Sequence, residues 1–191
     1  VVPGRSDYHY NANWKMQMDN GMDPYHLTST HTTFMKVVQR RQAGESDNEQ
    51  VTSPDFRDRF TMAAGMYTFK NGHSMIWNDH PKPETQPFWG MIEDVRKHVG
   101  DEKAKWMARS RNITIFPNLQ FNDSTSLVLR TFIPHAPNLT EMKVYSFAPV
   151  AERDELRTIR VRQHEDFFNS SGMATPDDTI CYFDCQEGYN A

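Results

Sequence analysis

Two histidines in the first part of the sequence, His26 and His31, are spaced so that they could hold a metal ion. Neutral imidazole is a common ligand of iron, zinc and copper. On an ideal α-helix, residues five positions apart point about 140° away from each other. The pair converges on one ion only if the helix bulges or ends between them. Residues 28–33 are mostly hydroxyl or β-branched, and such residues loosen a helix.

The third donor of such a site has to come from elsewhere in the chain, since two histidines alone are more often structural or exposed residues. A zinc-protease motif needs glutamate directly after the first histidine, and Leu27 stands there. Two adjacent carboxylates, Asp177 and Asp178, follow Pro176 near the other end of the chain. They suit a solvated turn or a helix N-cap. Joined to the histidines, one of them completes a two-histidine, one-carboxylate face that leaves positions on iron(II) open for dioxygen.

Composition limits the class of protein. The 191 residues suit one domain, and 37% hydrophobic with 12% aromatic residues excludes a disordered chain. The net charge of −4 gives no footprint for nucleic acid or an anionic membrane, and we find no transmembrane run or signal peptide. The two cysteines, Cys181 and Cys185, cannot build a disulfide scaffold or an iron–sulfur cluster, and we expect them to be reduced. These features predict a cytoplasmic protein.

Methionine and aromatic residues are abundant, with 11 Met, 12 Phe, 7 Tyr and 4 Trp. They suit an adaptable apolar cavity and equally an ordinary core. The chain has neither βαβ alternation nor a glycine-rich phosphate loop, which excludes a Rossmann or P-loop nucleotide site.

The hydrophobic pattern predicts an α+β fold in which an antiparallel sheet is covered by helices. In the first half we expect a strand at 7–14, a helix at 15–31 restarted at Asp23 by Pro24, an exposed loop at 40–58 and a hairpin at 66–77 around Asn71-Gly72. In the second half we expect a loop at 80–87, a helix at 88–108 interrupted at Gly100, strands at 112–117, 125–133 and 142–148, and a last helix at 151–168 ended by Gly172 and Pro176.

Several motifs together resemble one enzyme family over essentially the whole chain. Asn13-Trp14-Lys15, Asn20 and Asp23-x-Tyr25-His26-x4-His31 resemble the mononuclear-iron motif of Rieske-type aromatic-ring-hydroxylating dioxygenase large subunits. The stretches Phe116-Pro117-Asn118, Arg162–Phe168, Ser171–Asp178 and Cys185–Tyr189 resemble the catalytic domain of the benzoate, toluate and anthranilate branch, where the first is a strand element. The resemblance implies a helix-grip fold, in which a curved antiparallel sheet wraps a long C-terminal helix.

The resemblance also implies roles for individual residues. His26, His31 and Asp178 would bind iron, with Asp177 as the substitute for Asp178 if the register differs by one. Asp23 would link the iron centre to a Rieske-cluster histidine of the neighbouring subunit, and Asn20 would lie near the iron. The substrate pocket would include Phe168, Asn112 and Phe121.

Two departures from the family pattern stand out. Pro24 occupies a position where a small residue is common. The Cys-x-His and Cys-x2-His motifs of a Rieske domain are absent from residues 1–191. We therefore expect a mononuclear-iron catalytic domain without its Rieske domain, truncated before the family's usual C-terminus, that binds its ligands but does not turn over alone.

The implied reaction adds O2 to an aromatic carboxylate such as benzoate, anthranilate or salicylate at non-haem iron(II). The product would be a cis-dihydrodiol, or a catechol where the ring carries an amino or hydroxyl group. Electrons would come from NAD(P)H through a reductase and the 2Fe-2S cluster of a partner domain. The implied assembly is trimer-based, with a possible small β subunit.

No residue is singled out as the anchor of a substrate carboxylate. Arg109, Arg111, Arg130 and Asn112 are candidates by strand location only, and residues of these types are more often exposed surface groups than anchors. Two other classes of function stay open. One is a metal-free helix-grip module that binds a small aromatic ligand, and the other is an interaction domain.

Overall fold

A single antiparallel sheet organises the part of the chain that the computed structural model describes, residues 4–42, 63–80 and 83–191. Its seven strands lie in the order β1-β7-β6-β5-β4-β3-β2, so that only β1 departs from sequential pairing by joining β7. The strands are β1 Gly4–Tyr10, β2 Ala64–Thr68, β3 Ser74–Asn78, β4 Ser110–Ile115, β5 Leu119–Asn122, β6 Leu127–Ala136 and β7 Leu139–Phe147.

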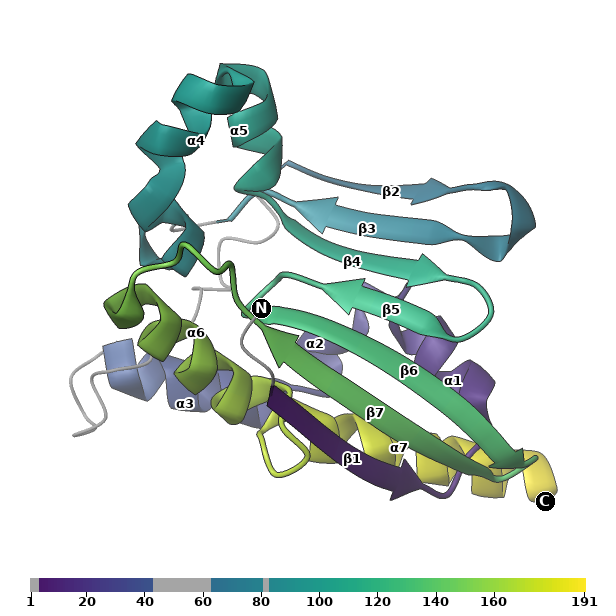
Figure 1. Ribbon diagram of the computed structural model, residues 1–191. Coiled ribbons are helices and arrows are strands. Elements are labelled where there is room, and N and C mark those ends of the chain that lie inside the picture. The colour runs from purple at the N-terminus through teal and green to yellow at the C-terminus, as the bar shows by residue number, and fades with distance from the viewer. Residues whose placement is uncertain (1–3, 43–62, 81–82) are drawn as a thin grey trace.

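Helices cover one face of this sheet. Figure 1 shows α1, α2, α3, α6 and α7 along that face, while α4 and α5 stand beside one end of the strands. The α-helices are α1 Trp14–Asn20, α2 His26–Ser29, α3 Thr32–Gln42, α4 Ile92–Val99, α5 Asp101–Met107, α6 Asp154–Phe167 and α7 Ala174–Asn190. Short 3-10 helices occupy Lys70–Gly72 (η2), Pro83–Thr85 (η3) and Pro87–Met91 (η4). The predicted α+β class with a helix-grip sheet is confirmed.

The core lies between the sheet and these helices, because alternate residues of each strand point inward. Phe34 of α3 and Phe167 of α6 pack with Val128 and Val144 of the two long strands. Further along the same strands, Tyr182 of α7 closes a second cluster, which is made of Tyr10, Ala12, Phe132 and Met142. The two clusters fix α6, α7 and α3 against the same face.

Predictions that rest on local turn chemistry are confirmed. The hairpin forms as β2 and β3, and both turn residues, Asn71 and Gly72, have positive φ. The helix at 88–108 is interrupted at Gly100, where φ is 82°. The predicted loop at 40–58 lies largely outside the described residues, and its first residues belong to α3. The segment 80–87 holds part of two 3-10 helices.

Three predictions about elements are wrong. The strand β5 was not expected, and Phe116-Pro117-Asn118 belongs to the connection between β4 and β5 rather than to a strand. The predicted last helix is α6, but the longer helix α7 follows it. Pro176 does not end a helix, because it lies in the first turn of α7, where its missing N–H costs nothing. Gly172 does lie between the two helices.

Candidate metal centre

The two histidines converge because the helix breaks between them. Helix α2 ends at Ser29 and α3 begins at Thr32, so His31 stands in the gap. The imidazole rings of His26 and His31 are 5.2 Å apart between centroids. His31 is only 2% exposed, while His26 is partly open. The break supplies the convergence that a continuous helix would prevent.

The first turns of α7 supply a carboxylate to the same place. Oδ1 of Asp178 lies 3.1 Å from Nε2 of His31 and 3.8 Å from Nε2 of His26. One ligand atom from each of the three residues lies within 4.8 Å of the other two. Two imidazole nitrogens and a carboxylate oxygen so placed are the donor set of a mononuclear non-haem iron centre.

The other ring nitrogens of the histidines have partners that orient the rings. Nδ1 of His26 donates to the backbone carbonyl of Asp23 at 2.6 Å. Nδ1 of His31 lies 3.4 Å from Oδ2 of Asp177. Both contacts leave Nε2 facing Asp178, which is the arrangement that metal-binding histidines need from their outer partners. Asp177, the substitute ligand considered from the sequence, lies outside this three-atom group.

Asn20 and Asp23 border the group without joining it. The Asn20 side-chain amide donates to Oδ1 of Asp178 at 3.0 Å and lies 3.2 Å from Nε2 of His26. The Asp23 side chain is 45% exposed, and its Oδ1 accepts the backbone N–H of Tyr25. Asp23 is thus open to a partner, whereas Asn20 is turned toward the histidine and carboxylate.

The electrostatics of the site favour a cation. Burial lowers the pKa of His26 below its ordinary value of 6.5, although Asp178 opposes that shift. At His31 burial acts in the same direction, but the hydrogen bonds and charges of Asp178 and Asp177 outweigh it and raise the pKa. His26 is therefore held in the neutral form that binds metals, beside carboxylates that attract positive charge.

These residues line a cavity between the sheet and the helices. Its wall includes Asn112 of β4 and Phe168 at the end of α6, two of the residues that the resemblance implies for a substrate pocket. Phe121 does not line it, and that prediction is wrong. Asn112 pairs with Asn122 across the sheet, and successive residues of a strand face opposite sides, so Phe121 points to the other face. There its ring contacts Phe147.

The segment that carries the site is tied to the sheet by contacts that the sequence did not reveal. Gln17 and Gln120 exchange a buried side-chain hydrogen bond at 2.9 Å, and Gln120 also donates to the Gln17 carbonyl. The Asn112 amide donates to the carbonyl of Gly21 at 3.0 Å. A Cβ on Gly21 would stand 2.0 Å from Nε2 of Gln120, so only glycine allows this approach.

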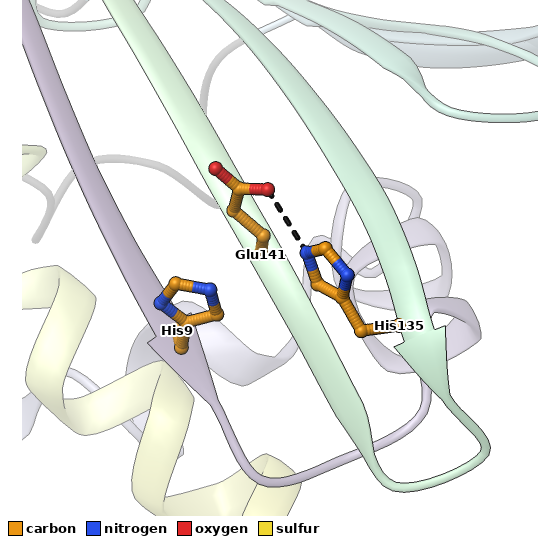
Figure 2. A group of neighbouring side chains, drawn as sticks. All are labelled: His9, His135 and Glu141. Carbon is orange, nitrogen blue, oxygen red and sulfur yellow. Dashed lines mark hydrogen bonds and ion pairs between the residues drawn. The ribbon is translucent and has the colours of Figure 1, made fainter.

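A second group of possible metal ligands lies on the outer face of the sheet. Figure 2 shows His9 of β1, His135 of β6 and Glu141 of β7 side by side, with His135 bonded to Glu141 at 3.0 Å. Both histidines are exposed, and Lys143 forms an ion pair with Glu141 at 3.5 Å. This group borders no cavity among those described, so the buried group is the candidate metal centre.

Comparison with known proteins decides the family. Residues 2–191 match the family described as the ring hydroxylating alpha subunit (catalytic domain). The chain belongs to that family.

Three relatives from bacteria agree with this membership. The 2-halobenzoate 1,2-dioxygenase large subunit of Burkholderia cepacia and the toluate 1,2-dioxygenase alpha subunit of Pseudomonas putida are each 38% identical to this chain. The anthranilate 1,2-dioxygenase large subunit of Acinetobacter baylyi is 35% identical. Each alignment covers 99% of this chain but only 40 to 42% of the relative.

Solved structures of the family share the fold. A naphthalene 1,2-dioxygenase with indole bound in its active site matches all of this chain and 43% of its own, with a TM-score of 0.74 and 22% identity. The Rhodococcus enzyme bound to indole also has a TM-score of 0.74, at 19% identity. In the described part of this family member, no helix is long and apolar enough to cross a membrane.

Proposed function

We propose that this chain is the catalytic domain of an oxygenase that adds O2 to the ring of an aromatic carboxylate. The observation that carries the proposal is the buried group of His26, His31 and Asp178 on the wall of a cavity. The 2-halobenzoate, toluate and anthranilate dioxygenases among its relatives supply the substrate class. The product is a cis-dihydrodiol, or, where the ring carries an amino or hydroxyl substituent, a catechol formed by loss of that substituent together with the carboxylate as CO2.

Iron(II) is the metal that fits the site. Nε2 of His26, Nε2 of His31 and the Asp178 carboxylate would hold it, and the neutral and anionic donors match its preferences. Bound there, iron(II) would supply the binding and reductive activation of dioxygen. Asp23 and Asp177 would keep the two imidazoles oriented through Nδ1.

The cavity wall would orient the ring and keep water away from it. Phe167 and Phe168 offer apolar faces against which a planar ring can pack. Asn20 donates to Asp178 and would hold that carboxylate in place beside the histidines. These residues would position the ring relative to the metal ligands, so that one edge of the ring reacts.

The electrons would reach the site from a cluster outside residues 1–191. The two cysteines are free and cannot ligate a Rieske cluster. We propose that NAD(P)H reduces a reductase, that a 2Fe-2S cluster of a neighbouring subunit passes the electrons on, and that the exposed Asp23 faces that subunit. The complete enzyme would be a trimer-based assembly, in which a small β subunit can take part.

The test measures product formation by the complete oxygenase containing this chain, with benzoate, O2, NADH and a reductase. Asp178→Ala should abolish oxygenated product, whereas the matched control Glu141→Ala, at the outer group of Figure 2, should keep it. Equal activity of Asp178→Ala and wild type would refute the proposed site. Tight binding of benzoate by protein that takes up no iron would favour a metal-free binding module instead.

A further inference from the structure

Arg130 on β6 is buried without a counter-charge among the residues that the structure describes. Its side chain is 5% exposed, and its Nε has no hydrogen-bond partner there. No described carboxylate forms an ion pair with it, whereas the buried Arg160 pairs with Glu152, and the partly buried Arg109 and Arg111 pair with Asp79 and Asp123. Removing a guanidinium from water without a counter-charge costs free energy. A bound anion next to Arg130 would offset that desolvation cost.

The other two arginines considered from the sequence already have carboxylate partners. Arg109 pairs with Asp79 at 2.7 Å and stacks on two tryptophan rings. Arg111 donates from Nε to the carboxylate of Asp123 at 2.8 Å. Neither arginine lines the cavity with the metal group. The expectation that a surface charge is the more common role of these arginines is wrong for Arg130, which is buried.

Arg130 belongs to the cavity that holds the metal ligands. It lines that cavity together with His26, His31 and Asp178. Its guanidinium lies 4.7 Å from the centre of the Phe168 ring, which restrains the group against one wall. The charge at Arg130 and that at Asp178 act in opposite directions on the pKa of Tyr182, so both lie within electrostatic reach of one hydroxyl.

The cavity that Arg130 lines holds further polar groups that suit a ligand with a polar end. Thr125 lines the same cavity, and its buried hydroxyl has no hydrogen-bond partner among the described residues. The side-chain oxygen Oδ1 of Asn112 is also without a partner among the described residues, while its Nδ2 donates to the carbonyl of Gly21. Buried polar groups are normally satisfied, so a ligand with hydrogen-bonding atoms fits this cavity.

We propose that Arg130 binds the carboxylate of the aromatic substrate and so makes this chain selective for aromatic acids over uncharged rings. A guanidinium donates two parallel N–H···O bonds to a carboxylate, and this pairing is stronger out of water. Anchoring one end of the substrate fixes which edge of the ring faces the metal ligands. Arg130 is then a specificity-determining residue as well as a binding residue. The proposal rests on the proposed function for the class of substrate.

The test measures dissociation constants of benzoate and of its uncharged analogue benzamide, by calorimetry on the metal-loaded holoenzyme containing this chain. Arg130→Met should weaken benzoate about thirtyfold, as expected for loss of a buried charged pair, and should change benzamide by less than about threefold. Arg130→Lys should recover part of the benzoate affinity. The matched control Arg162→Met, at an exposed arginine paired with Glu165, should change neither constant.

Thermal unfolding of the ligand-free variants separates an anchor from a structural arginine. Because the charge of Arg130 is unpaired, Arg130→Met should unfold at the same temperature as wild type or higher. A lower unfolding temperature together with equal losses for benzoate and benzamide would overturn the proposal. Unchanged benzoate binding in Arg130→Met, or binding of neither ligand by wild type, would overturn it too.

The outcomes distinguish this proposal from the proposed function. Arg130-dependent benzoate binding without iron uptake or oxygenated product would support the anchor and refute the oxygenase. Oxygenation of benzoate that is unaffected by Arg130→Met would support the oxygenase and refute the anchor.

Discussion

Asp177 and Asp178 are neighbours in sequence, but the structure gives them different surroundings. Asp178 is 8% exposed and approaches both imidazoles through Oδ1, while Asp177 reaches only the Nδ1 of His31. Spacing alone could not choose between the two carboxylates, because the choice depends on where the first turn of α7 begins. Only the family resemblance favoured Asp178.

This difference predicts unequal losses of iron. Asp178→Ala should abolish stoichiometric iron(II) binding, and Asp177→Ala should lower the affinity by about 10- to 100-fold, as loss of an outer partner does. Titration of the protein with iron(II) against a competing chelator measures both. The reverse order, with Asp177→Ala losing the metal and Asp178→Ala keeping it, would assign the ligand role to Asp177.

The buried His164 of α6 should make the stability of the folded protein depend on pH. Burial lowers its pKa below the ordinary 6.5, and the charge of Arg130 adds to this shift. Because the folded pKa is depressed, the unfolded chain binds the proton more readily, and stability is lost as the pH falls through about 6.5. His164→Gln should therefore unfold with a shallower loss of stability between pH 7.5 and 5.5 than wild type. Urea unfolding of the metal-free proteins measures this, and parallel pH profiles would contradict it.

At the scale of elements, the site depends on how α1 sits against the sheet. Asn20 comes at the end of α1, and Gly21 directly after it approaches Gln120 and Thr114 closely. The buried pair of Gln17 and Gln120 joins residues 103 positions apart in the sequence. The position of Asn20 beside the metal ligands therefore depends on a long-range contact.

Gly21→Ala should lower the free energy of unfolding by about 2 kcal/mol, because the new methyl group must displace the hydrogen-bonded Gln120 side chain. Iron affinity should fall with it. The matched control is Gly188→Ala in α7, where a Cβ meets nothing within 4 Å and helix propensity favours alanine. Urea unfolding and iron titration of both variants test this, and equal stability of the two would show that the contact is unimportant.

Local chemistry explains which elements the sequence predicted. Asn71-Gly72 and Gly100 need positive φ, a property of single residues, so the hairpin and the helix interruption were predictable. The four-residue β5 is too short for a hydrophobic period, and Pro176 suits a helix start as well as a helix end. To predict which face of the sheet carries Phe121, the register of β5 against β4 must be known, and no local sequence pattern gives that register.

At the scale of the whole molecule, the sheet and its helices enclose a cavity. The candidate metal ligands and Arg130 all line it. The sequence motifs were enough to predict the histidines and the carboxylate. They were not enough to select Arg130 among the arginines, because burial and the absence of a described counter-charge appear only in the folded chain.

The exposed Asp23 predicts a variant that separates metal binding from electron delivery. Asp23→Asn should keep its iron, because the backbone carbonyl that accepts from Nδ1 of His26 at 2.6 Å is unchanged, whereas the Asp23 carboxylate lies farther away, with Oδ2 3.7 Å from that nitrogen. Turnover of the complete oxygenase with NADH and reductase should fall by at least about tenfold if that side chain faces the cluster-bearing subunit. Iron content and steady-state product formation are measured on the same preparation. Normal turnover would exclude Asp23 from the path to the cluster.

The most direct test of the account is the amount of iron(II) that the protein retains after anaerobic reconstitution and desalting. Wild type and His9→Ala should each hold one mononuclear iron, since His9 belongs to the exposed outer group. His26→Ala should hold none at this site. Iron retained in full by His26→Ala, or lost in His9→Ala, would contradict the assignment of the metal to His26, His31 and Asp178.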